Sequence, residues 1–434
     1  MLIDWLEVSY CEGWDAGTRT AIGPLTVALA AERDRAGEQY AVLLSVSGQP
    51  LVIIEVAWRA GCCGVWFLDE QRRRTLTVDC RRLTLDRLFV TGGRQWAYSG
   101  PADPEFDDKV TRGEYEMGTD GSRSGGATIR GAKNPDIWFV RAEPPDAWLD
   151  APAFGEWGQL IQAFPEHLAA LGHELSTGVR LEDVSDPEGT GLPPAQWPWH
   201  PPRPLQPAHL DLLFRPGTRL EVGTSEAIEG VGGAVAVEVA QLGMLRLPSG
   251  ALIACDPTYL QPVEPDASEW VTKSCSYGQS HHPFTATVPP GDYPVVLSRF
   301  RWFSGSGPTV AAVKVWIGDG AVDSWEMALR AGEDPRLLPD GGFFGFGVDA
   351  GTGCFFDAVA ASALAPQTRQ FVLGYQESRE LTDDASGANL IAFSSGWGDG
   401  SYPVWIGRTA AGDIACFVAD LLTFDIMTPI PPHA

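Results

Sequence analysis

The sequence predicts a mainly antiparallel β protein of the α+β class with two domains, the second a β-sandwich or barrel-like sheet with one or two short helices. Short runs of β-branched and aromatic residues recur along the chain, and glycine or proline turns separate nearly all of them. This pattern favours stacked or curled sheets over alternating β–α units. At 434 residues, the chain is also too long for one ordinary hydrophobic core.

Residues 1–182 are predicted to form an N-terminal α+β domain. Strands are expected at 40–46, 51–58, 65–69, 75–79, 88–90, 95–98 and 136–141. Thr91-Gly-Gly-Arg94 has the composition of a tight hairpin turn. Because strands that are neighbours in sequence usually pair, we expect an antiparallel meander.

Two further segments of this domain have distinct patterns. Residues 99–135 are polar and rich in glycine, and they predict a flexible loop. Their glycines match neither a phosphate-binding loop nor a dinucleotide fingerprint. Residues 156–171 have helical spacing of apolar residues, and Pro165 predicts a kink or break there.

Residues 183–207 are predicted to be a proline-rich linker that sets the domain boundary. Proline at this density excludes helix and central strand and favours extended chain. Trp197 and Trp199 are too apolar for a free linker. We therefore expect them to pack this segment onto one of the domains.

Residues 208–434 are predicted to form the second, mainly β domain. Strands are expected at 234–240, 251–255, 284–288, 293–298, 310–317, 344–348, 390–393, 404–406 and 414–418. A short helix is expected at 355–364. Three motifs between Gly342 and Leu421 place an aspartate beside glycines at the end of an apolar run. Such a motif suits either a ligand site or a tight β-turn.

Five motifs of this domain carry a family resemblance. In order they are Leu247-Pro-Ser-Gly-Ala-Leu-Ile-Ala-Cys-Asp-Pro257, Pro289-Pro-Gly-Asp-Tyr-Pro-Val295, Val322-Asp-Ser-Trp-Glu-Met-Ala328, Val348-Asp-Ala-Gly-Thr-Gly-Cys-Phe-Phe-Asp357 and Gly396-Trp-Gly-Asp-Gly-Ser-Tyr402. The C-terminal half therefore resembles the bacterial domain of unknown function 4241. The resemblance implies a compact, mainly β intracellular domain and supplies no catalytic residues.

The net charge of -25, from 56 acidic and 31 basic residues, narrows the range of partners. A strongly acidic protein repels phosphate, so nucleic acid and anionic membranes are not expected as partners. A basic protein is a suitable partner.

The N-terminal residues lack a basic region and a long apolar segment, so we expect a cytoplasmic protein. The adjacent Cys62 and Cys63 are expected to be independent thiols.

The candidate ligand-binding residues lie at predicted strand ends and turns of the second domain. They are Asp256, Asp349, Trp397, Asp399, Tyr402 and Asp420, which we expect on one rim of the domain. Aromatic rings beside carboxylates suit a polar ligand or a cationic side chain. Converging carboxylates would also suit a divalent cation.

Two other groups of residues suggest chemistry. Arg73, Arg81 and Arg87 belong to the one locally basic region and suggest a patch for an anion or acidic partner, or a strand edge protected by charge. Cys275, His281 and His282 suggest a thiol–base pair or soft metal ligands, or an ordinary polar loop. No nucleophile elbow occurs in the sequence.

Two hypotheses of function follow from these patterns. The first is a binding module, such as an immunity or accessory protein that binds a protein partner, and it is supported by the acidity and the aromatic content. The alternative is a metal-assisted hydrolase with an aspartate-rich site in the C-terminal domain. The sequence favours the binding module.

Overall fold

The computed structural model of the chain consists of two compact units. Unit 1 comprises Met1–Pro204 and Arg336–Asp340, and unit 2 comprises Leu205–Pro335 and Gly341–Ala434. The structure describes residues 1–107, 109–119, 121–130, 136–141, 147–223, 232–260, 282–302, 308–368, 371, 373, 378–423 and 426–430. The fold is mainly antiparallel β, as the sequence predicts, and 49% of the described residues lie in strands and 13% in helices.

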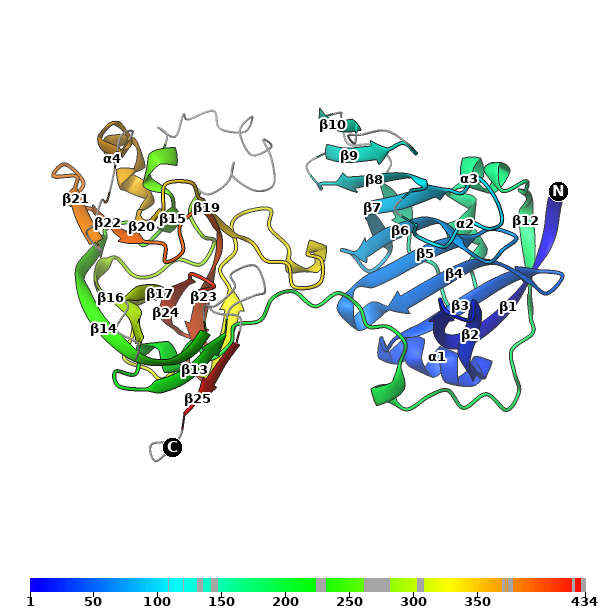
Figure 1. Ribbon diagram of the computed structural model, residues 1–434, viewed down its shortest axis with the longest axis horizontal. Helices are drawn as coiled ribbons and strands as arrows, with labels where there is room; N and C mark the ends of the chain where they lie inside the picture. Colours follow the sequence, from blue (N-terminus) through cyan, green and yellow to red (C-terminus); the bar gives the residue numbers. More distant parts are fainter. Residues whose placement is uncertain are drawn as a thin grey trace. The chain divides into compact units, whose positions relative to one another are not determined.

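Unit 1 is built on one large sheet (Figure 1). Its strands follow the order β10-β9-β8-β7-β6-β5-β4-β3-β1-β12, with β2 paired to β1 and β11 to β7. The strands are β1 (Leu2–Asp15), β2 (Thr20–Leu25), β3 (Tyr40–Val46), β4 (Gln49–Ala57), β5 (Cys62–Leu68), β6 (Arg74–Arg82), β7 (Arg87–Ala97), β8 (Thr111–Met117), β9 (Ser122–Thr128), β10 (Asp136–Arg141), β11 (Trp148–Asp150) and β12 (Glu174–Asp183). From β3 to β10 the sheet is the predicted antiparallel meander, whereas β12 pairs with β1 in parallel.

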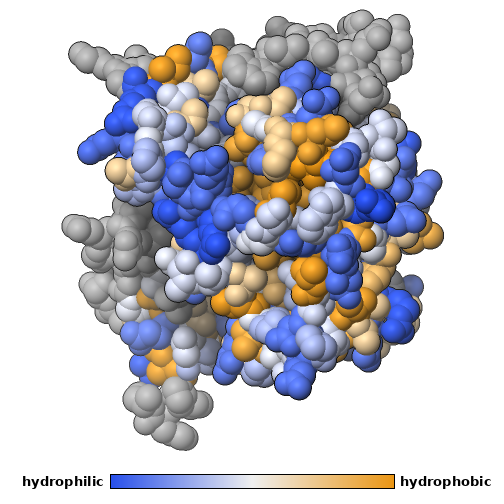
Figure 2. All heavy atoms as spheres, turned by 90° about the vertical axis from the view of Figure 1, so that its right-hand side faces the viewer, coloured by the Kyte–Doolittle hydropathy of each residue, from blue (hydrophilic) through white to orange (hydrophobic). Residues whose placement is uncertain are grey.

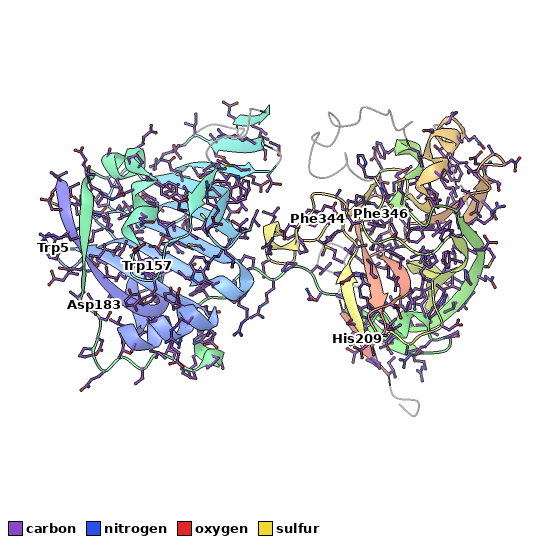
Figure 3. All side chains as sticks on the ribbon, turned by 180° about the vertical axis from the view of Figure 1, so that it is seen from behind. Trp5, Trp157, Asp183, His209, Phe344 and Phe346 are labelled. Atoms are coloured by element: carbon purple, nitrogen blue, oxygen red, sulfur yellow. The ribbon has the colours of Figure 1, made fainter. Side chains whose placement is uncertain are left out.

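Short helices cover one face of this sheet and close the main core of unit 1. They are α1 (Val27–Ala36), α2 (Gly158–Gln162) and α3 (Pro165–Ala170), with single turns at η1 (Trp58–Ala60) and η2 (Pro194–Gln196). Trp157, labelled in Figure 3, is fully buried in this core, where its ring contacts Tyr40 of β3 and its indole donates a hydrogen bond to the Tyr10 hydroxyl of β1. The predicted helix of residues 156–171 is broken before Pro165, which begins α3 because proline needs no hydrogen bond at that position.

The proline-rich segment lies against unit 1 through its two tryptophans. The Trp199 indole donates a hydrogen bond to the Glu12 carbonyl over 2.9 Å. The Arg33 guanidinium lies over the Trp197 ring, 5.1 Å from its centroid, and forms a buried salt bridge with the Glu12 carboxylate. The prediction that these tryptophans pack the segment onto a domain is confirmed.

Unit 2 contains a large sheet that curls into a half barrel and a smaller sheet beside it (Figure 1). The large sheet contains β13 (Arg219–Gly223), β14 (Gly232–Leu247), β16 (Gly291–Trp302), β17 (Thr309–Trp316), β18 (Ser324–Met327), β19 (Gly345–Val348), β23 (Gly400–Arg408), β24 (Ile414–Asp420) and β25 (Ile426–Pro429). The smaller sheet contains β15 (Leu252–Cys255), β20 (Thr352–Asp357), β21 (Ser378–Thr382) and β22 (Asn389–Ser394).

The core of unit 2 lies between these sheets. Phe346, labelled in Figure 3, is buried there with Phe355, Phe393 and Phe417. The helical elements are α4 (Ala361–Thr368) and single turns at η3 (Leu212–Phe214), η4 (Pro257–Tyr259), η6 (Pro335–Leu337) and η7 (Ala358–Ala360). None of the helices in the described part of the chain has the length and apolar character that a bilayer span requires.

Four local predictions are wrong. The expected strand 284–288 does not form, and Phe284 makes only an isolated bridge with Arg330. Residues 88–98 form no hairpin, because β7 runs unbroken through Gly92 and Gly93. The glycine-rich segment around residues 111–128 is not a loop but the hairpin of β8 and β9, since main-chain pairing needs no apolar side chains. The residues of the predicted helix 355–364 begin in β20, because Phe355 and Phe356 pair with β22, and α4 starts only at Ala361.

Candidate functional site

Strand pairing brings several predicted site residues to one end of the sheets of unit 2. Cys255, the last residue of β15, pairs with Cys354 near the start of β20. The end of β19 pairs with the start of β23, where Val348 is opposite Gly400. We call Asp256, Asp349, Trp397, Asp399 and Tyr402, which belong to these strand ends and their turns, the aspartate rim.

Asp256 is the buried anchor of the aspartate rim. Its side chain is 0% exposed, and one carboxylate oxygen accepts hydrogen bonds from the amides of Asp349 and Ala350 at 2.9 and 3.1 Å. The other oxygen accepts from the amide and hydroxyl of Thr258, and through this contact Asp256 caps the N-terminus of η4. Asp256 therefore holds the β19–β20 turn, and a ligand in solvent does not reach its carboxylate.

Asp349 and Asp399 are the exposed acids of the aspartate rim. The Asp349 carboxylate accepts a hydrogen bond from the Tyr259 hydroxyl over 2.7 Å. The Asp399 carboxylate accepts from the amide of Gly351 over 3.1 Å. Asp349 and Gly351 belong to the β19–β20 turn, so this hydrogen bond joins the Asp349 turn to the neighbouring turn that carries Asp399. Each carboxylate is fixed by a residue of another segment.

The Asp399 turn also carries Trp397. Its indole donates to the Thr423 carbonyl over 2.9 Å, while the side chain remains 44% exposed. Gly396 before it has φ 73°, and a Cβ there would lie 2.5 Å from the Val310 carbonyl oxygen, so only glycine fits. The turn reading of Gly396-Trp-Gly-Asp-Gly400 is correct, and the turn presents Trp397 and Asp399 together.

Tyr402 has a structural position rather than an exposed one. It is 5% exposed, packs on Phe346 and donates its hydroxyl to the Gly398 carbonyl over 2.7 Å. Burial raises the pKa of its hydroxyl. The buried Tyr402 side chain therefore stabilises the turn that carries Trp397.

Asp420 ends β24 at the same end of the sheet, but its side chain lies on a different face. Ala419 and Leu421 belong to the core, so alternation turns Asp420 to the outer face of the sheet. Its carboxylate accepts from the Leu422 amide, and burial raises its pKa to about 6. The structure therefore does not bring Asp420 into the group formed by Asp349 and Asp399.

The described residues provide little for metal or thiol chemistry. Among them, no group of three or more His, Cys, Asp or Glu side chains is placed to hold a metal ion. Cys275 and His281 lie outside the described residues, while burial lowers the pKa of His282. Cys62 and Cys63 are buried free thiols, as expected.

The three arginines of the predicted basic patch do not share one surface. Arg73 is 3% exposed, forms a salt bridge with Asp69 and donates to two carbonyls of the following loop. Arg81 is 6% exposed, and only Arg87 is exposed, beside Asp150. The expectation of a surface patch is therefore wrong for Arg73 and Arg81, which are both buried. For Arg73 the reason is the loop of residues 100–103, because sequence alone does not show that it folds over this side chain.

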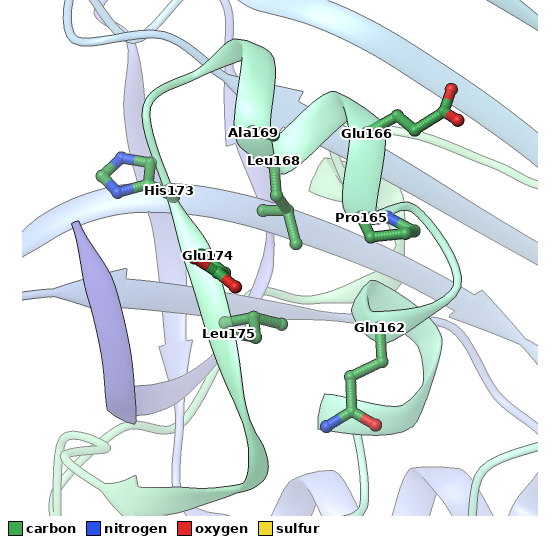
Figure 4. A pocket seen from close by; sticks show the side chains of 8 residues that line it. All are labelled: Gln162, Pro165, Glu166, Leu168, Ala169, His173, Glu174 and Leu175. Atoms are coloured by element: carbon green, nitrogen blue, oxygen red, sulfur yellow. The ribbon is translucent and has the colours of Figure 1, made fainter.

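Unit 1 has a surface pocket of about 430 Å³ that the sequence does not indicate (Figure 4). Leu168 and Leu175 form its apolar part, and Glu166, Glu174 and His173 border it. Burial lowers the pKa of His173. Figure 2 shows the side of unit 1 near β1 and β12, where apolar side chains mix with hydrophilic ones. None of the predicted site residues lines the pocket.

Comparison with known proteins agrees with the C-terminal resemblance. Residues 245–419 match the model of the family described as "Protein of unknown function (DUF4241)". The match spans β15 to β24 and includes every residue of the aspartate rim. No curated protein and no solved structure matches the chain.

Proposed function

We propose that unit 2 is a binding module whose aspartate rim recognises a cationic side chain of a basic protein partner. The observation that carries this proposal is that two exposed carboxylates, Asp349 and Asp399, lie on adjacent turns joined by the hydrogen bond from Gly351 to Asp399, and that the Asp399 turn also carries the exposed indole of Trp397. A carboxylate pair with an adjacent aromatic ring suits an ammonium or guanidinium group.

The hydrogen bonds that hold these turns favour a role in binding over a purely structural role. Asp256 already caps the β19–β20 turn from the buried side. Asp349 and Asp399 each accept a hydrogen bond at the surface, so their side chains are positioned before a ligand arrives. Fixed side chains lose less conformational entropy on binding, which raises affinity.

The net charge of the whole chain also favours a basic partner. A net charge of -25 attracts a basic protein over a long range and accelerates association. An immunity or accessory protein that neutralises a basic toxin would use these features. No observation among the described residues favours the hydrolase alternative, because the buried Asp256 is occupied by amides and Asp420 faces elsewhere.

The experiment uses the full chain labelled with 5-fluorotryptophan. The Trp397 resonance is assigned from its loss in Trp397→Phe, and it is then followed during titration with a trilysine peptide. We expect a saturable shift that is about tenfold weaker in the Asp349→Asn/Asp399→Asn variant, which corresponds to about 1.4 kcal/mol. Trilysine acetylated on its side chains should produce no shift.

A matched control separates this site from general attraction to an acidic protein. Asp319→Asn/Asp323→Asn removes the same charge from exposed positions beyond the opposite end of β17. This variant should bind trilysine as the unaltered chain does. Equal weakening in both double variants would show nonspecific attraction and refute the site.

A further inference from the structure

The sheet of unit 1 ends at β12, an edge strand with one neighbour. Among the described strands β12 pairs only with β1, and an edge strand presents unpaired N–H and C=O groups on its other side. The register skips residues 176–179, which form a bulge, and is regular over residues 180–183. Apart from this ladder, the main chain of residues 175–182 is not hydrogen-bonded to any other described element. The edge is therefore open to a further strand.

The bulge brings the two ends of β12 close together along the sheet. Leu175 is opposite Ile3 of β1. Arg180 is opposite Trp5, only two residues after Ile3. Leu175 and Arg180 are therefore about 7 Å apart along the strand direction. Because Leu175 also lines the pocket of unit 1, one extended segment can reach both the pocket and the regular part of the edge.

The pocket has an apolar floor between α3 and β12. The Leu168 side chain points toward Leu175, and Pro165 and Gln162 lie on the opposite side of the opening (Figure 4). The volume of about 430 Å³ lies in the range of ligand pockets. A floor of two leucines suits an apolar side chain.

The apolar core of unit 1 is incompletely covered along this edge. Leu175, Val179 and Leu181 of β12 pack against the core but are only partly buried. On the other face of the two strands, Leu2 is 58% exposed and Trp5, labelled in Figure 3, is 40% exposed. A strand added to β12 would bury apolar surface on both faces of the sheet.

The charge of the edge favours a basic occupant. Glu166 and Glu174 border the pocket, and Glu182 lies further along β12. All three are exposed, and none forms an ion pair with another described residue. Since β12 has three acidic residues and one arginine, two copies of this strand would repel each other. The edge therefore suits a peptide with lysine or arginine better than a second copy of the chain.

We propose that the edge of β12 and the adjacent pocket bind an extended peptide segment of a partner protein, in which lysine or arginine flanks an apolar side chain. The peptide pairs with residues 180–183 through its main chain and adds a strand to the sheet. Its apolar side chain enters the pocket against Leu168 and Leu175, and its basic side chains contact Glu166 and Glu174. This site lies within unit 1 and uses no residue of the aspartate rim.

The test begins with selection of random octapeptides, displayed on phage, against the full chain. The most enriched peptide is then titrated by fluorescence polarisation. We expect enriched peptides to combine an apolar residue with flanking lysine or arginine. Ala169→Trp, which fills the pocket from α3, should weaken binding at least tenfold. Ala170→Trp adds the same side chain at the next exposed position, outside the pocket lining, and should bind as the unaltered chain does.

Two further measurements separate the charge of the site from the pairing of main chains. Glu166→Gln/Glu174→Gln should weaken the peptide about tenfold, whereas Glu32→Gln/Glu38→Gln removes the same charge from exposed positions elsewhere in unit 1 and should have no effect. N-methylation of the peptide, one residue at a time, should block binding at alternate positions, because only every second N–H faces the neighbouring strand.

The proposal is overturned by a library that yields no enriched peptide, or by a peptide that binds Ala169→Trp and Ala170→Trp equally. Binding that tolerates N-methylation at every position would exclude the added strand. A dimer of the unaltered chain that Ala169→Trp dissociates would assign the edge to a second copy. Melting temperatures identify a variant that fails to fold, in which case Ala169→Met replaces Ala169→Trp.

Discussion

The carboxylate of Asp256 lies 2.9 Å from the amide nitrogen of Asp349, a residue 93 positions further along the chain. This hydrogen bond joins the end of β15 to the end of β19, and the adjacent Ala350 amide bonds to the same oxygen. The buried carboxylate of Asp256 therefore fixes the position of the exposed Asp349. The two aspartates resemble each other in sequence but have different roles.

The first prediction concerns this division of roles. Asp256→Ala should lower the free energy of unfolding by about 3 kcal/mol, because it leaves buried amide donors without an acceptor. Asp399→Asn should change it by less than about 1 kcal/mol, because the side chain is exposed. Urea denaturation of the full chain, followed by circular dichroism, measures both. A larger loss in Asp399→Asn than in Asp256→Ala would reverse the assigned roles.

Sequence reasoning recovers the turns of unit 2 well, because glycine and aspartate have strong local preferences. It places Gly396 to Gly400 in a turn and Asp349 and Asp399 beside strand ends, as the structure does. It does not predict that Asp256 is buried while Asp349 is exposed, since burial depends on which strands pair across distant parts of the chain.

The same limit explains what the sequence does not show in unit 1. The burial of Arg73 depends on a loop that folds back from residues 100–103, and no local pattern signals that contact. The row formed by Glu55, Gly64 and Asp79 across three strands depends on the register of β4, β5 and β6. The alternation of side chains along each strand predicts that Glu55 and Asp79 point away from the core, but it does not predict that they flank the same glycine.

A second prediction tests the backbone of the Trp397 turn. Gly396→Ala should destabilise unit 2 by about 1–3 kcal/mol, because alanine is strained at φ 73° and its Cβ would approach the Val310 carbonyl. Gly387→Ala is a suitable control, since it also has positive φ but open space around it. Denaturation midpoints should fall more for Gly396→Ala. Equal losses would show that backbone strain alone, without the Val310 contact, sets the cost.

A third prediction follows from the raised pKa of Glu55, which is about 7 in the folded protein against an ordinary value of 4.5. Between these values the folded state holds a proton that the unfolded state has lost, so the Glu55 contribution to stability falls as pH rises from 4.5 to 7. Glu55→Gln removes this contribution. Its melting temperature relative to the unaltered chain should rise across that window and stay level above it.

The measurement is a pair of melting curves at pH 4, 5, 6, 7 and 8. Glu32→Gln serves as the control, because its side chain is exposed on α1. The difference between Glu32→Gln and the unaltered chain should show no rise over the same window. A Glu55→Gln difference that does not change with pH would mean that the Glu55 carboxylate is not desolvated.

The last prediction is that each unit folds by itself and that the tryptophans of the proline-rich segment stabilise only unit 1. Leu205 donates its amide to the Gly342 carbonyl within unit 2, whereas Trp199 donates to Glu12 within unit 1. A fragment of residues 205–434 should therefore unfold in one cooperative transition, because it retains the whole core of unit 2. In the full chain, Trp199→Ala should lower the transition of unit 1 and leave that of unit 2 in place. Calorimetry resolves the two transitions, with the fragment identifying the second. A fragment without a cooperative transition would mean that residues before Leu205 complete the second core.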